Sequence, residues 1–146
     1  MSRTSLTYGL IQVGDDAALS LLASAEVVEQ YARLTGDFNP VHLDEDYAAR
    51  SFFKKRVVHG SMAAGLISAV LGTRLPGPGA IYLHQELDFK KPVFLGETIT
   101  ARVKVLEKID RHKKIKLRTW VENQAGWLVL DGTALVLFRP NDPVTP

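Results

Sequence analysis

Residues 60–75 read GSMAAGLISAVLGTRL and contain no charged side chain before Arg74. A helix that is apolar all round must be buried on most of its sides. The stretch therefore predicts a long helix from Gly60 to Leu75 that forms the core of the fold. The run Pro-Gly-Pro-Gly at 76–79 ends this helix sharply.

The sequence after this helix alternates apolar and polar residues with a period of two, as half-buried strands do. In the segment 81–89, the face predicted to be buried holds Ile81, Leu83, Gln85, Leu87 and Phe89. Further strands are predicted at 99–109, 115–122 and 127–138. Short turn-like sequences join them, which implies that neighbouring strands are antiparallel.

The sequence before the helix predicts a strand at 17–22 and a second helix at 25–34. Ser24 has the side chain of an N-cap, and Gly36 supplies the left-handed residue that ends this helix. A short helical turn is predicted around 44–50. One long buried helix with a meander of strands curled round it is the hot-dog fold, an α+β architecture.

Length and composition predict one globular domain over residues 1–146, with a loose tail at 140–146. The net charge of +2 gives no indication of nucleic-acid binding. The absence of cysteine excludes disulfides, thiolate nucleophiles and cysteine-based metal sites. The longest uncharged run, 59–73, is shorter than the roughly 20 residues of a membrane span, so we expect no membrane association. The N-terminal segment 1–8 lacks a long apolar core followed by small residues, so we expect no secretory signal.

A second stretch, residues 31–48 with the sequence YARLTGDFNPVHLDEDYA, contains the candidate chemistry. Asp37 and His42 lie on either side of Asn39 and Pro40, which forbid a continuous helix between them. The two side chains can therefore converge on one point. A water held there could lose a proton to one group and find its next proton at the other, as hydration or dehydration of a double bond requires.

This motif resembles that of the MaoC-like dehydratases, most closely the (R)-specific enoyl-CoA hydratases. Further matches follow in order over about residues 24–100. They are Val58-His59-Gly60, Leu75-Pro76-Gly77-Pro78-Gly79, Phe89-Lys90-Lys91-Pro92-Val93 and Gly96-Glu97-Thr98. The resemblance implies the hot-dog fold and a lyase that converts trans-2-enoyl-CoA reversibly to (3R)-3-hydroxyacyl-CoA without a metal or redox cofactor.

The resemblance also implies a homodimer with an acyl-CoA thioester as its substrate, and a place in fatty acid or polyhydroxyalkanoate metabolism. We expect a cytoplasmic protein, with an organelle matrix as the alternative. Three other functions share the fold. They are a dehydratase of 3-hydroxyacyl groups on acyl carrier protein, an acyl-CoA thioesterase and a non-catalytic acyl-thioester binding protein.

In the family, the residues that match Asp37 and His42 transfer protons, and the resemblance implies these roles here. Gly60 is the candidate for stabilising the enolate oxygen of the thioester, because its N–H lies at the start of a helix. Local sequence leaves other interpretations open. Asp37 could form an Asx-turn with the backbone of Asn39, and His42 could be an ordinary buried histidine. Asn39 is interpreted as architectural, its amide fixing the loop.

Three residues around the start of the long helix are candidates for substrate contacts. His59 is expected to orient the turn at Gly60 rather than to act as a second acid–base group. Ser61 stands where the family commonly has methionine, so its part in lining the thioester pocket is open. The hydroxyl of Ser68 could face the substrate or bond to the helix carbonyl four residues earlier.

Two groups of basic residues could attract the phosphates of CoA. Those close to the motif are the better candidates, namely Lys54, Lys55 and Arg56. The second group shares one face of a predicted strand and is interpreted as a solvated outer sheet face, namely Lys114, Lys116 and Arg118.

Overall fold

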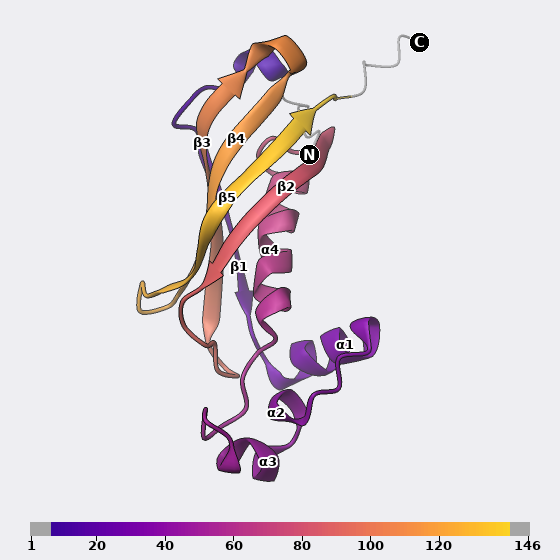
Figure 1. The fold of residues 1–146 in the computed structure, drawn as a ribbon, viewed down its shortest axis with the longest axis vertical. Coiled ribbons are helices and arrows are strands. Elements are labelled where there is room, and N and C mark those ends of the chain that lie inside the picture. Colours follow the sequence, from indigo (N-terminus) through magenta and orange to yellow (C-terminus); the bar gives the residue numbers. More distant parts are fainter. Residues whose placement is uncertain (1–6, 141–146) are drawn as a thin grey trace.

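The computed structural model describes residues 7–140. Figure 1 shows a curved sheet with the long helix α4 beside it, and three shorter helices gathered at one end of the sheet. Apart from Pro140, the predicted loose tail lies outside the described residues. Within residues 7–140, no helix is both long enough and apolar enough to cross a membrane.

The sheet has five strands in the order β1-β3-β4-β5-β2, and every neighbouring pair is antiparallel. The strands are β1 (Asp16–Leu22), β2 (Ala80–Phe89), β3 (Thr98–Ile109), β4 (Lys114–Asn123) and β5 (Leu128–Phe138). Each predicted strand is confirmed to within one residue at either end. The hot-dog prediction is therefore confirmed, as an antiparallel sheet with a long helix against one face.

The helix α4 (Gly60–Thr73) buries one side against the sheet and ends two residues earlier than predicted. Its buried residues are Met62, Ala63, Leu66, Ile67, Val70 and Leu71. Burying a large aliphatic side chain contributes about 1.5–3 kcal/mol, so this face holds helix and sheet together. The opposite face is exposed and consists of small residues, namely Ser61, Gly65, Ser68 and Gly72.

The strand β2 departs from the predicted alternation. Leu83 is 44% exposed, Ile81 is 46% exposed and Phe89 is 61% exposed, although all three were expected to be buried. Two features explain the difference. The strand lies at the edge of the sheet, and a bulge between Tyr82 and His84 shifts its register against β5.

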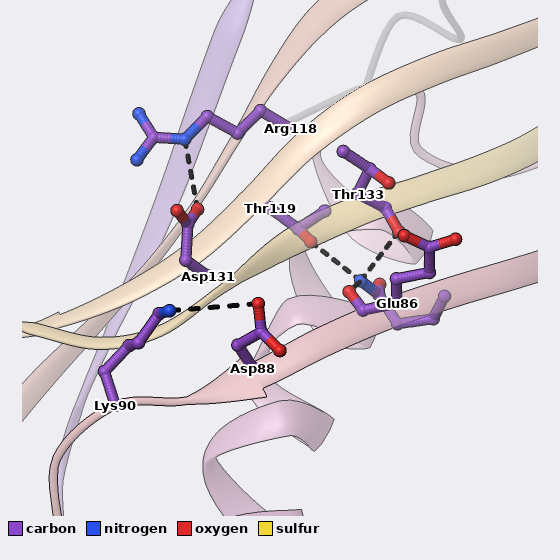
Figure 2. A network of polar contacts seen from close by, with 8 residues as sticks. Glu86, Asp88, Lys90, Arg118, Thr119, Asp131 and Thr133 are labelled. Atoms are coloured by element: carbon purple, nitrogen blue, oxygen red, sulfur yellow. Dashed lines mark hydrogen bonds and ion pairs between the residues drawn. The ribbon is translucent and has the colours of Figure 1, made fainter.

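Polar contacts join the strands near this edge (Figure 2). The Nε2 of Gln85 donates to the Oγ1 of Thr119 at 2.8 Å and to the carbonyl oxygen of Thr133 at 3.0 Å. Thr119 is fully buried, so its hydroxyl needs such a partner. On the outer face, Arg118 bonds to Asp131 at 3.2 Å, in agreement with a solvated, charge-paired surface.

The three short helices form the end of the molecule where α4 begins (Figure 1). They are α1 (Ala25–Thr35), α2 (Pro40–Leu43) and α3 (Glu45–Arg50). The predicted caps of α1 are confirmed. The Oγ of Ser24 accepts the N–H of Val27 at 3.2 Å, and Gly36 is left-handed with φ of 80°. Two single 3₁₀ turns complete the described elements, η1 (Tyr8–Leu10) and η2 (Asp110–His112).

Candidate active site

A cavity of about 450 Å³ opens where the short helices meet the start of α4. Its walls are mainly apolar and include Val41, Val58, Ala63 and Val93. The polar lining residues are Asn39, His42, His59, Lys90 and Lys91, together with the backbone of Gly60. An apolar cavity with a few convergent polar groups is the usual form of a small-molecule site.

The imidazole of His42 is held in one tautomer. Its Nδ1 lies 2.7 Å from the carbonyl oxygen of Val57, and because a carbonyl can only accept, Nδ1 carries the hydrogen. Burial lowers the pKa of His42, and the neighbouring His59 lowers it further, whereas the Val57 carbonyl and the Asp37 carboxylate act in the opposite direction. At neutral pH the ring is therefore uncharged, with a free lone pair on Nε2.

Asp37 lies directly after the Gly36 cap, and its side chain turns back toward the ring nitrogens. A carboxylate oxygen of Asp37 and ring nitrogens of His42 and His59 all lie within 4.8 Å of one another. One oxygen, Oδ1, also accepts the N–H of Asn39 at 3.2 Å, which is the Asx-turn considered above. The turn and the approach of the carboxylate to within 4.8 Å of His42 are both present in the structure.

His59 connects these two residues and is itself 1% exposed. Its ring stacks on that of His42, with centroids 3.8 Å apart and planes 28° apart. Its Nε2 donates to the backbone carbonyl of Asp37 at 3.0 Å. The sequence predicted that His59 orients the Gly60 turn. The observed contacts of its ring are with Asp37, His42 and Tyr31.

Gly60 presents an unused backbone donor to the cavity. Among the residues that the structure describes, none accepts its N–H, as expected at the first position of a helix. A Cβ at this position would lie 2.9 Å from Cε1 of Phe89. Any larger residue here would therefore press on the Phe89 ring, which forms one wall of the cavity.

Asp37, His42 and His59 are also residue types that bind divalent metals. Each ring, however, already directs one N–H at a backbone carbonyl. Each of the stacked rings therefore has one nitrogen left for other contacts.

The predicted group of basic residues divides in the structure. The side chain of Arg56 is 11% exposed, and its Nε donates to the carbonyl oxygen of His42 at 2.7 Å, with Glu45 at 3.3 Å from its Nη1. Arg56 thus supports the backbone of His42, and its burial limits its access to a phosphate. Lys54 is exposed, and Lys55 lies over the ring of Phe94 at 4.1 Å.

Two lysines that the sequence interpretation missed line the cavity instead. Lys90 lies 3.8 Å from the carboxylate of Asp88 (Figure 2), and Lys91 lies 4.6 Å from the centre of the Trp127 ring. Both lysines stand in the motif at 89–93. That motif was interpreted through its family resemblance, and its positive charge was not used.

The two serines lie outside the cavity. The hydroxyl of Ser61 is 2.6 Å from that of Tyr31 on α1. Ser68 lies on the exposed face of α4, in a separate groove beside Tyr82 and Leu83 on β2. Asn39 has the architectural role expected of it, because its Oδ1 caps α2 by accepting the N–H of Val41 at 3.2 Å.

Comparison with known proteins adds to this geometry. The sequence model of the MaoC like domain family matches residues 14–126. The (R)-specific enoyl-CoA hydratase of Rhodospirillum rubrum is 46% identical over 87% of this chain and 88% of its own length. A mitochondrial 3-hydroxyacyl-[acyl-carrier-protein] dehydratase of Arabidopsis thaliana is 30% identical over 90% of this chain and 80% of its own.

Among solved structures, the (R)-hydratase from A. caviae involved in PHA biosynthesis superposes with a TM-score of 0.86. It is 42% identical to this chain, and the match covers 89% of this chain and 98% of the other.

The contacts of Arg56 generate a stability prediction. Arg56→Met removes the bond to the His42 carbonyl while keeping a long side chain, and should lower the free energy of unfolding by about 2 kcal/mol. Lys54→Met is the matched control and should have little effect, since Lys54 is exposed. Urea unfolding followed by tryptophan fluorescence measures both. Equal stabilities for the two variants would show that the bond contributes nothing.

Proposed function

This chain belongs to the MaoC-like dehydratase family, and we propose that it is an (R)-specific enoyl-CoA hydratase. It adds water to a trans-2-enoyl-CoA to give the (3R)-3-hydroxyacyl-CoA, and the reverse dehydration uses the same groups. The observation that carries the proposal is that His42 and Gly60 line one apolar cavity, and that a carboxylate oxygen of Asp37 lies within 4.8 Å of a ring nitrogen of His42. The identity to hydratases over most of the chain supports it.

In the proposed mechanism, Asp37 and His42 hold one water between them. The free lone pair on Nε2 of His42 takes one proton of the water as its oxygen attacks the β-carbon of the enoyl group. The imidazolium that forms lies beside the Asp37 carboxylate, which stabilises its charge. The same proton then passes from Nε2 to the α-carbon, so one water supplies both the hydroxyl and the hydrogen.

Gly60 supplies the third requirement. Attack at the β-carbon moves negative charge onto the thioester oxygen, and the Gly60 N–H at the positive end of α4 is placed to donate to it. A donor of this kind contributes roughly 3 kcal/mol to transition-state stabilisation in other enzymes. We propose that Lys54, Lys55, Lys90 and Lys91 attract the CoA phosphates near the cavity.

Two alternatives use the same site. A dehydratase of acyl groups on acyl carrier protein would present the same thioester end, and the plant relative makes it the runner-up. A thioesterase would need water directed at the carbonyl carbon, and no described contact favours that over the β-carbon. Paired proton-transfer groups argue against a non-catalytic binding protein.

We also propose that two copies of the chain associate through β2. This edge strand has ten residues and exposes Ile81, Tyr82 and Leu83 beside the small-residue face of α4. A long apolar edge left unpaired invites aggregation, whereas pairing it with a second copy would cover it. We place the enzyme in the cytoplasm or an organelle matrix, in fatty acid or polyhydroxyalkanoate metabolism.

The direct test is incubation with crotonyl-CoA. We expect loss of the enoyl absorbance and a product consumed only by a (3R)-specific dehydrogenase, because water pinned by Asp37 and His42 reaches one face of the alkene. Crotonyl groups on acyl carrier protein form the comparison arm. A product drained by a (3S)-specific dehydrogenase would contradict the assignment, and faster turnover of the carrier-protein substrate would favour the runner-up.

Removal of either group that holds the water should abolish most activity. Asp37→Asn and His42→Gln change volume little, and each should reduce kcat by at least about 100-fold while urea unfolding stays near that of the wild type. Since both groups act on one water, the double variant should be little worse than the poorer single variant. Losses that multiply would instead indicate independent roles.

The pKa of His42 sets a pH dependence. The mechanism needs the neutral ring, so kcat/KM should fall as His42 becomes protonated at low pH. Because burial lowers this pKa, the midpoint should lie below the ordinary value of 6.5. In Asp37→Asn the loss of the nearby carboxylate should move the titration of His42 lower still, measurable by NMR of the ring. A midpoint above 6.5 would refute this account.

The dimer is tested by the mass in solution. Light scattering should give about twice the chain mass of 16.1 kDa. Leu83→Lys places a charge on the β2 edge and should give monomers. Leu106→Lys is the matched control, because Leu106 on β3 is 43% exposed and Leu83 is 44% exposed. A wild-type monomer at micromolar concentration would exclude the assembly.

A further inference from the structure

Tyr31 lies on α1, outside the cavity, yet it contacts the residues on both sides of Gly60. Its ring centre is 4.8 Å from that of His59, with the planes tilted by 58°. Its hydroxyl forms a bond of 2.6 Å with that of Ser61. The start of α4 is therefore fixed to α1 by one ring contact and one hydrogen bond.

The ring of His59 links Tyr31 to the candidate catalytic residues. His59 contacts the ring of Tyr31 and also stacks on the ring of His42, with centroids 3.8 Å apart. The same imidazole donates to the backbone carbonyl of Asp37 at 3.0 Å. His59 is buried and closely packed, so its neighbours cannot adjust independently of it. A shift of His59 would therefore displace both Asp37 and His42.

We propose that Tyr31, held in place by Ser61, is a positioning residue that acts through His59 on both Asp37 and His42. The inference rests on the proposed function and deepens it. Ser61 contributes the hydroxyl to which that of Tyr31 is bonded. Because neither Tyr31 nor Ser61 lines the cavity, substrate binding should depend little on them.

The expected effect is on the chemical step. A displacement of about 1 Å of a reacting group can cost on the order of 100-fold in rate. Tyr31→Leu removes the ring and should lower kcat by about 10- to 100-fold with KM little changed. Tyr47→Leu is the matched control, since Tyr47 lies on α3 and is 45% exposed. It should leave kcat unchanged.

The hydroxyl bond is tested separately from the ring. Tyr31→Phe and Ser61→Ala delete the same bond while the ring contact stays, so each should cause a similar and smaller loss of kcat. The double variant should equal the single ones. Losses that add in the double variant would show that the bond does not couple the two residues.

A pH readout distinguishes positioning from general stability. The groups that face His42 are Asp37, His59 and the Val57 carbonyl, with Arg56 on its backbone and Glu45 beyond Arg56. Loss of the Tyr31 ring should let water reach His59 and His42, and relief of burial should raise the midpoint of the His42 titration. NMR of the ring in the full chain measures it without turnover.

Failure of the proposed function and failure of this inference give different results. A wild type without hydratase activity would refute the proposed function, and the NMR titration would still test whether Tyr31 positions His42 through His59. The inference would be overturned if the wild type is active and Tyr31→Leu keeps both the wild-type kcat and the wild-type pH midpoint of the His42 titration. A variant that loses only stability or only KM would also overturn it. If Tyr31→Leu fails to fold, equal kcat for wild type, Tyr31→Phe and Ser61→Ala overturns it.

Discussion

The α4 helix has no charged residue, and the rest of the molecule follows from the need to cover one side of it. The sheet supplies that cover, and five antiparallel strands are enough to do so. At the start of the helix, the N–H of Gly60 has no acceptor among the residues that the structure describes. The short helices α1, α2 and α3 gather at that end (Figure 1). The candidate site therefore lies where the core helix begins, and rigid elements support it.

Chemistry at that end depends on which nitrogen carries a proton. The bond from His42 to the Val57 carbonyl leaves Nε2 as an acceptor, and burial keeps the ring neutral. A second carbonyl, that of Asp37, fixes His59 in the same manner. Arg56 supports the His42 backbone from behind. Three hydrogen bonds to backbone carbonyls thus fix Asp37 and His42. Proton transfer needs groups placed to within a fraction of an ångström.

Much of this could be predicted from sequence, because periodicity and caps are local. The strand limits, the caps at Ser24 and Gly36 and the pairing of Asp37 with His42 all came from residues close together in the chain. Contacts between distant segments could not be predicted in that way. Arg56 binds a backbone carbonyl, which has no signature in the sequence, and was interpreted as a phosphate ligand. The bulge at Leu83 depends on the partner strand.

The carbonyl acceptors of the two histidines have a consequence for how the site can change over time. A backbone carbonyl survives substitution of its own side chain, so residue 57 can drift among side chains that fit without altering the tautomer of His42. The protonation pattern of the site is therefore robust to mutation at the positions that set it. The tautomers of the two histidines depend on where the backbone carbonyls lie, and not on the side chains of the residues that carry them.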